Sequence, residues 1–300
     1  MSAAAPVVAA AGESTARTPL WWGAWLTGGV ALAFALGPLL WTVDPHLPAA
    51  RAAAFAAPSM AHPLGTDEQA RDVLARVLAG GRLALHVGLG TALITLTVGL
   101  ALGLVAGWLG GLTDAIVRRT ADVALAFPGI LLALLVMHLA PPDAGAWTVV
   151  LALAATGWAG PCRVVRALTV QLRARPWVVA ARCLGAGHAR ILTRHLLPAV
   201  LGPAAVHATF AVAGAILGEA SLSFLGLGPR GVVSWGALLE EGAATLLRSP
   251  RLVVATAGAL LSLQVGLNLL ADGLRDRLDP RTGGAGLQHL ALAGGDDAAR

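Results

Sequence analysis

Long apolar runs, separated by short polar or Arg-containing segments, are the main pattern along this 300-residue chain. Six of these runs are long enough to supply most or all of the roughly 17–25 residues that an α-helix needs to cross a bilayer. They lie at 20–43, 83–109, 123–140, 146–162, 196–217 and 252–271. Trp21, Trp22 and Trp41 lie near the ends of the first run, as is typical of a membrane–water interface. The pattern predicts an all-α integral membrane protein with six transmembrane helices.

The stretches outside these runs define the predicted organisation. Residues 1–19 and 282–300 are rich in small residues, and we expect both to be disordered cytoplasmic tails. Residues 20–43 form the first transmembrane helix, residues 44–82 an extracytoplasmic segment, and residues 83–281 the main transmembrane domain. A cleaved signal peptide is the alternative, because Ala54-Phe55-Ala56 resembles a cleavage site. The first apolar run is too long for a signal peptide and ends well before that site, which favours a retained helix.

The composition excludes several classes of protein. The chain is 57% hydrophobic and 12% charged, whereas soluble proteins average about 25% charged residues. It contains no lysine, which excludes a P-loop and a Schiff-base catalyst, so any ATP is bound by another chain. Cys162 and Cys183 fall in or near predicted cytoplasmic segments. We expect them to pack rather than to form a disulfide or bind metal.

The arginines indicate an orientation. They flank the apolar runs instead of covering a soluble face, so the positive-inside rule explains the net charge of +5 better than nucleic-acid binding does. With six spans and both termini in the cytoplasm, fourteen arginines are cytoplasmic and seven extracytoplasmic. This asymmetry places residues 176–198 in the cytoplasm.

Residues 176–198, PWVVAARCLGAGHARILTRHLLP, lie between two apolar runs but carry three arginines. Pro176 favours the start of a helix, and Gly185 with Gly187 favour its end and a turn. The spacing predicts two short amphipathic helices at the membrane surface, a shape suited to docking. The residues that share a predicted helix face are Trp177, Ala181 and Leu184 in the first helix, and Ile191 and His195 in the second.

This segment resembles the "EAA" loop of permease subunits in ATP-binding-cassette importers. In that family the loop fits a cleft in the cytoplasmic ATPase and passes its motion to the membrane helices. Val179 stands where the family has an acidic residue, which removes an expected charge contact. An ordinary interfacial loop is the structural alternative. The residues on the family pattern are Ala180, Ala181, Gly185, Ile191, His195, Leu197 and Pro198, and by resemblance all of these except Leu197 are the ATPase-coupling residues.

Four further regions resemble the dipeptide, oligopeptide and nickel branch of these permeases, in the family's order. Ala70, Ala75 and Ala271 replace a Gly, a Ser and a Gly of the family strings. The regions are HPLGTD with RDVLAR at 62–76, LAFP at 125–128, EASLSFLGLG with SWG at 219–236, and NLLADGLRDRLDPR at 268–281.

Several local structures follow from these strings. Thr66 or Asp67 is expected to cap a helix beginning near Glu68, with Arg71, Asp72 and Arg76 pairing along it. Pro128 is expected to bend the third span near its start. The fourth span is expected to continue as a helix into the cytosol beyond Cys162.

The string that begins at Glu219 contains the candidate translocation-pathway residues, Glu219, Ser221 and Ser223. Its glycines and serines suggest a re-entrant or broken segment, which membrane depth tolerates only against protein or a water-filled path. An ionisable residue at such a place is a candidate for the transport pathway. A structural role for Glu219, capping or pairing at the end of the span, is the stronger alternative.

The resemblance covers about residues 62–281. It implies the type I importer permease (MetI-like) architecture in a bacterial cytoplasmic membrane, with both termini cytoplasmic. It also implies four kinds of partner: a second, homologous permease, two cytoplasmic ATP-binding subunits, an extracytoplasmic solute-binding protein and membrane lipid. The chain itself would form a non-catalytic pathway for peptides or nickel complexes, without cofactor, metal or nucleic acid.

A self-contained secondary transporter or channel is the alternative. It predicts charged or unwound positions near the centres of the spans, which are mainly apolar here. A membrane enzyme would need a constellation such as H-E-x-x-H or G-x-S-x-G, and the sequence contains neither.

Overall fold

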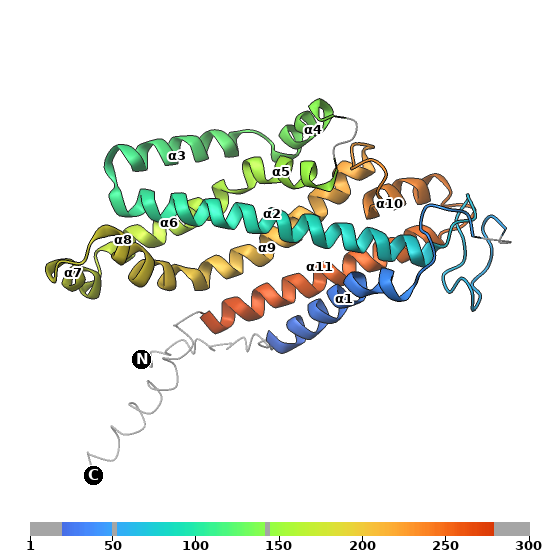
Figure 1. The fold of residues 1–300 in the computed structure, drawn as a ribbon, viewed down its shortest axis with the longest axis horizontal. Helices are drawn as coiled ribbons and strands as arrows, with labels where there is room; N and C mark the ends of the chain where they lie inside the picture. Colours follow the sequence, from blue (N-terminus) through green and yellow to red (C-terminus); the bar gives the residue numbers. More distant parts are fainter. Residues whose placement is uncertain (1–19, 50–52, 142–144, 279–300) are drawn as a thin grey trace, which may run out of the picture.

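The computed structural model describes residues 20–49, 53–141 and 145–278, and every regular element in these ranges is helical (Figure 1). The predicted tails at 1–19 and 282–300 lie outside these ranges. The elements are α1 (Leu20–Leu40), α2 (Val73–Leu109), α3 (Gly111–Ala126), α4 (Gly129–Leu139), α5 (Ala146–Gly157), α6 (Ala159–Arg173), α7 (Pro176–Cys183), α8 (His188–Ile191), the π-helix η1 (Leu192–Leu196), α9 (Leu197–Phe224), α10 (Trp235–Ala244) and α11 (Arg251–Leu278).

Four helical segments are each long and apolar enough to cross a membrane. They are α1, α2, α11 and the continuous segment His188–Phe224, which comprises α8, η1 and α9. Two further pairs, α3 with α4 and α5 with α6, meet the same requirement only when each pair is taken as one span. The described residues therefore hold four candidate spans, or up to six if each bent pair is one span. The prediction of an all-α, multi-pass architecture is confirmed, and the count of six stays a prediction.

Helix α2 is the central element of the bundle, and it packs against α1, α5, α6 and α9. Its contact with α6 is close because glycines face that helix. A Cβ atom on Gly103 would lie 2.7 Å from the Cys162 carbonyl oxygen, and one on Gly107 would lie 2.8 Å from that of Arg166. Small residues of this kind let membrane helices approach at backbone distance.

The third predicted span is divided. Helix α3 ends at Ala126, α4 begins at Gly129, and the two meet at an angle of 82°. Pro128 lies at the break, where its missing N–H and fixed φ oppose a continuous helix. The predicted bend is confirmed, and the prediction that residues 123–140 form one span stays a prediction. The predicted helix beyond Cys162 is present, because α6 continues to Arg173 after a bend of 41° from α5.

Helix α2 begins at Val73, and its N-cap is Asp72, whose side chain accepts a hydrogen bond from the Ala75 N–H at 2.7 Å. The prediction that Thr66 or Asp67 caps a helix near Glu68 was wrong. The Thr66 hydroxyl instead donates to the carbonyl of Ala53, at 2.7 Å, and residues 66–72 form a turn closed by a backbone bridge. Tertiary contacts thus set the start of α2.

The bundle is elongated, and its two candidate functional regions lie far apart. The turn between α7 and α8 is at one end, and the outer segment of residues 53–72 is at the other, next to α10 (Figure 1). Helices α2, α9 and α11 run between these ends. A displacement at α7 therefore has continuous helices along which it can be transmitted.

Candidate coupling site and outer polar clusters

The predicted helix at Pro176 is present, and it ends in a glycine turn. The Gly185 N–H donates to the Arg182 carbonyl and the Ala186 N–H to the Ala181 carbonyl, both at 3.0 Å. Together with a φ of +81° at Gly185, these bonds form a Schellman motif. Glycine is favoured there because an L-residue is strained at positive φ.

Helix α7 is fixed to the bundle through one side. Val178 is fully buried, and Ile191 and Leu196 of the following helical turns are buried beside it. All three belong to a core cluster that also contains Trp108 of α2 and Val165 of α6. The turn is therefore packed against the long helices and does not project from them as a free loop.

The opposite side of α7 is apolar and exposed. The exposed fractions are 42% for Trp177, 45% for Val179 and 89% for Leu184. Trp177 and Leu184 belong to the helix face predicted from the sequence, and the structure turns that face outward. The exposed arginines around it are Arg175, Arg182, Arg190 and Arg194.

The residues on the EAA-like pattern occupy different environments. Ile191 is buried, whereas Ala181 and His195 are half-buried. The His195 ring lies beside Trp177, with ring centroids 6.2 Å apart. The remaining residues of the pattern are exposed, except for Leu197, which is half-buried; the exposed ones are Ala180, Gly185 and Pro198.

A tryptophan of α2 contacts this turn, and no motif in the sequence indicates this contact. The Trp108 indole N–H donates to Nδ1 of His188 at 2.8 Å, and the Arg182 guanidinium lies 5.6 Å from the centre of the Trp108 ring. The Arg173 side chain donates to the Trp108 carbonyl at 3.3 Å. These contacts join parts of the chain that are far apart in sequence, so no local pattern reveals them.

The predicted pathway residues lie on one continuous helix. The Ser223 hydroxyl donates to Oε1 of Glu219 at 2.6 Å, and Ser221 donates to the Leu217 carbonyl of its own helix at 2.8 Å. Glu219 is fully buried, and its Oε2 atom has no hydrogen-bond partner among the described residues. The three residues lie before the predicted break: α9 continues to Phe224, Gly226 ends it, and the next helix, α10, begins at Trp235.

Helices α9 and α10, on either side of this break, pack closely against each other. A Cβ atom on Gly236 would lie only 2.0 Å from the Ala220 carbonyl oxygen, so the two helices touch at backbone distance. The adjacent Trp235 is buried, and its indole N–H donates to the Val77 carbonyl of α2 at 2.9 Å. The small residues of this string thus serve close helix packing at Gly236 and the end of α9 at Gly226.

An ion cluster fastens the outer segment to α2 and α10. The Arg76 guanidinium, on a residue only 3% exposed, donates to Asp67 at 2.6 Å and to the two oxygens of Glu241 at 2.6 and 2.9 Å. Arg71 donates to the same two carboxylates, at 2.8 Å each. Burial alone would raise the pKa of Glu241, but the hydrogen bonds and charges of Arg76 and then Arg71 outweigh it and hold that pKa below its ordinary value.

The predicted pairing of Asp72 with its neighbouring arginines was wrong. Its Oδ2 atom lies 2.7 Å from Nδ1 of His62, and its Oδ1 atom accepts a hydrogen bond from the Trp41 indole at 3.2 Å. Asp72 thus connects the end of α1, the outer segment and the first turn of α2. The arginines pair with Asp67 and Glu241 instead, and Glu241 is distant in sequence and carried no motif.

This arrangement of helices and sites agrees with one family of membrane proteins. Residues 99–284 match the family of binding-protein-dependent transport system inner membrane components, and the chain belongs to that family. It is therefore a multi-pass transport component of the inner membrane.

Individual relatives have more specific names. The chain is 37% identical to the oligopeptide transport system permease protein OppC of Bacillus subtilis over 225 residues, which are 75% of this chain and 73% of the relative. It is 39% identical to the dipeptide transport system permease protein DppC of the same organism over 226 residues, which cover 75% and 70% of the two chains. It is 38% identical to the glutathione transport system permease protein GsiD of Pectobacterium atrosepticum over 225 residues, which cover 75% and 74%.

Proposed function

We propose that this chain is the permease subunit through which an ATP-driven importer moves peptides across a bacterial inner membrane. The names of its relatives support a peptide as cargo, because they refer to oligopeptides, dipeptides and glutathione, itself a small peptide. The chain contributes the membrane path and no covalent chemistry. ATP is bound and hydrolysed by separate subunits.

The proposed assembly contains a second, homologous permease, two cytoplasmic ATPase subunits and an extracytoplasmic solute-binding protein. Both termini of this chain lie in the cytoplasm. The distribution of arginines supports this orientation, because more of them fall on the side of α7. The outer segment of residues 53–72 then faces the binding protein, and α7 faces the ATPases.

The observation that carries the proposal is the two-sided environment of α7. One side, at Val178, is buried in a core shared with α2, α6 and α9, and the other side presents exposed apolar residues within an arginine-rich surface. A partner that binds the exposed side of α7 and moves would also displace the buried side, because both belong to one short helix. ATP binding would close the ATPases, draw α7 with them and tilt the long helices between inward and outward openings.

The predicted coupling residues have different roles in this coupling. Gly185 ends α7, and Ile191 anchors the turn that follows. The small side chains of Ala180 and Ala181 allow a partner protein to approach the backbone of α7 closely. His195 and Pro198 lie where the π-helical turn joins α9, and such turns are frequent at functional sites.

For Glu219, Ser221 and Ser223 we propose a supporting role at the outer end of the pathway. Glu219 and Ser223 are bonded to each other inside the protein, which supports a role behind the wall of the pathway. Ser221 is half-buried on the same helix.

A pair of leucine variants tests the proposed docking surface. Leu184, at the end of α7, and Leu247, at the other end of the bundle, are 89% and 104% exposed, so neither side chain stabilises the isolated chain by burial. Burying a leucine in a partner is worth about 1.5–3 kcal/mol. Leu184→Ser should therefore weaken ATPase binding by roughly 10- to 100-fold, whereas Leu247→Ser should not.

The measurement is copurification and titration of the ATPase subunits against the permease pair, together with ATP-dependent peptide uptake into proteoliposomes. Equal ATPase binding by the two variants would remove α7 from the coupling interface. Peptide uptake by this chain without ATPase subunits would instead favour the self-contained transporter.

A further inference from the structure

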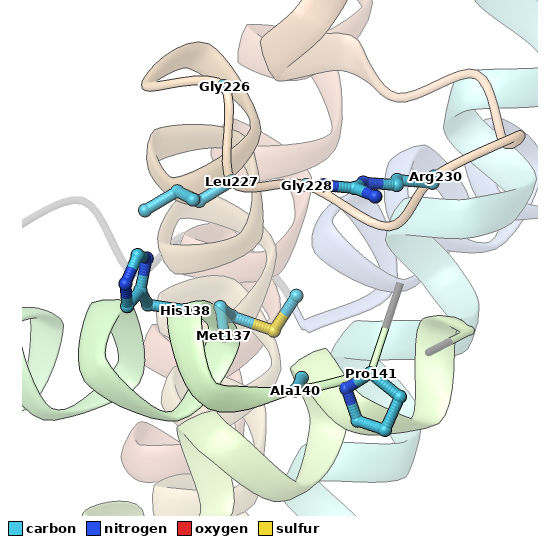
Figure 2. Close-up of a pocket in the computed structure, with 8 residues that line it drawn as sticks. All are labelled: Met137, His138, Ala140, Pro141, Gly226, Leu227, Gly228 and Arg230. Carbon is cyan, nitrogen blue, oxygen red and sulfur yellow. The ribbon is translucent and has the colours of Figure 1, made fainter. Parts of the chain in front are cut away.

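A pocket of about 260 Å³ lies between the end of α4 and the loop that follows α9. Figure 2 shows its two walls, one from each of these segments. The α4 side contributes Met137, His138, Ala140 and Pro141, and the loop contributes Gly226, Leu227, Gly228 and Arg230.

The loop that forms one wall is held in a defined conformation. Gly226 has a φ of +78°, and the Leu227 N–H donates to the Leu222 carbonyl at 2.9 Å, which closes α9 with a Schellman motif. A Cβ atom on Gly228 would lie 2.3 Å from the Ser223 hydroxyl oxygen, so the Gly228 backbone rests directly on that side chain. Because Ser223 is in turn bonded to Glu219, this pair acts as a positioning group behind the pocket.

The side chains around the pocket define the ligand that it suits. Arg230 supplies guanidinium N–H donors and His138 a ring N–H donor, and no acidic residue is present among the described residues that line the space. Met137 and Leu227 add apolar surface. In Figure 2 the Arg230 side chain extends along the loop toward Gly228, above Met137. Such a lining suits a carboxylate attached to a small uncharged group.

The volume narrows the choice of ligand further. Pockets that enclose a whole small ligand usually measure about 300–1,000 Å³. At about 260 Å³, this pocket suits one end of a larger molecule.

We propose that this pocket is a subsite for the C-terminal carboxylate of a peptide at the outer end of the permease. Arg230 binds the carboxylate, and Met137, His138 and Leu227, on the other side of the pocket in Figure 2, contact the last residue of the peptide. This proposal rests on the proposed function, because the orientation of the chain and the choice of a peptide come from there. The chemistry of the site is a carboxylate on an uncharged residue.

A protection experiment tests the pocket directly and does not depend on which cargo is transported. The purified complete importer is treated with an arginine-specific dicarbonyl reagent, and modification of Arg230 is read by mass spectrometry. Arg82 serves as an exposed internal reference. N-acetylalanine should reduce the modification of Arg230 several-fold and leave Arg82 unchanged, and N-acetylalanine amide should protect neither.

Three results would overturn the assignment. They are no protection of Arg230, equal protection by the amide, and protection by inorganic phosphate but not by N-acetylalanine. The last result would indicate a phosphate or lipid-headgroup site. N-acetylalanine also distinguishes the ligand class from the natural ligand. Protection by N-acetylalanine in an importer that transports no peptide would point to another carboxylic acid as the natural ligand.

A transport experiment tests whether peptides use the pocket. The uptake of a peptide with a free C-terminus is compared with that of its C-terminal amide, at saturating binding protein, for the parent importer, Arg230→Gln and Arg82→Gln. A hydrogen bond to a charged group contributes about 1.5–3 kcal/mol, so Arg230→Gln should lower the preference for the free acid about tenfold or more. An unchanged preference in Arg230→Gln would overturn the peptide assignment.

The two proposals can fail separately. An importer that moves no peptide, but whose Arg230 is protected by N-acetylalanine, would refute the peptide function and keep the carboxylate site. An importer that moves peptides but whose Arg230 is not protected would keep the peptide function and refute the carboxylate site. Copurification of the ATPase subunits with Arg230→Gln checks that the variant assembles.

Discussion

Gly185 and Gly187 form a matched pair for testing how α7 is ended. Both glycines are exposed, and a Cβ atom at either position would have no neighbour within 4 Å. They differ in backbone conformation, since φ is +81° at Gly185 and −69° at Gly187. An alanine at either position therefore meets no steric clash, and the comparison isolates the cost of left-handed backbone.

The expected magnitude follows from that conformation. An L-residue in the left-handed region is disfavoured by roughly 1–2 kcal/mol. Gly185→Ala should destabilise the Schellman ending of α7 by about this free energy. ATPase binding should then weaken by roughly 5- to 30-fold. Gly187→Ala places alanine in an ordinary extended conformation and should change binding by less than about twofold.

The assay is a titration of labelled ATPase subunits against the permease pair in lipid nanodiscs. Gly185→Asn provides a rescue, because asparagine tolerates positive φ better than alanine does, and it should recover part of the lost affinity. If Gly185→Ala and Gly187→Ala bind equally well, the left-handed residue does not control docking and the reasoning fails.

Two further predictions concern the outer half of the bundle. Gly236→Ala should lower the thermal unfolding midpoint clearly, because the new methyl group would meet the Ala220 carbonyl and such overpacking typically costs about 1–3 kcal/mol. A midpoint equal to that of the parent would contradict the close contact. Because the pKa of Glu241 is lowered in the folded protein, its contribution to stability is present above its unfolded pKa of about 4.3 and is lost as the pH falls through the lower folded value. Thermal unfolding between pH 7 and pH 3 should therefore show a loss at acid pH that is smaller in Glu241→Gln, and an identical acid loss in both proteins would refute the ion cluster as its source.

The sequence predicted best the features that depend on neighbouring residues. Pro176 at the start of α7, Gly185 at its end and Pro128 at the break between α3 and α4 each act through their own backbone geometry. The helical, apolar character of the long runs likewise required only local hydrophobicity. These features need no knowledge of the rest of the chain.

The features that were missed depend on distant contacts. Thr66 and Asp67 are good capping residues, yet Asp72 caps α2 because Trp41 and His62 hold its carboxylate in place. The small residues after Glu219 are equally compatible with a broken helix and with close packing. The structure contains both, since Gly226 ends α9 and Gly236 brings α10 onto it, and the second of these depends on a contact between helices. The family strings therefore indicated where close contacts occur, but not which distant residues make them.

The fastening of α10 has a mechanical consequence for the whole subunit. Arg76 and Glu241 tie it to α2, and Gly236 seats it on α9, so these three helices share one stiff frame. Helices α3 and α4, which meet at an angle of 82° across Pro128, are not part of that frame. A tilt that starts at α7 should therefore carry α2, α9 and α10 as a single lever arm instead of bending them one by one.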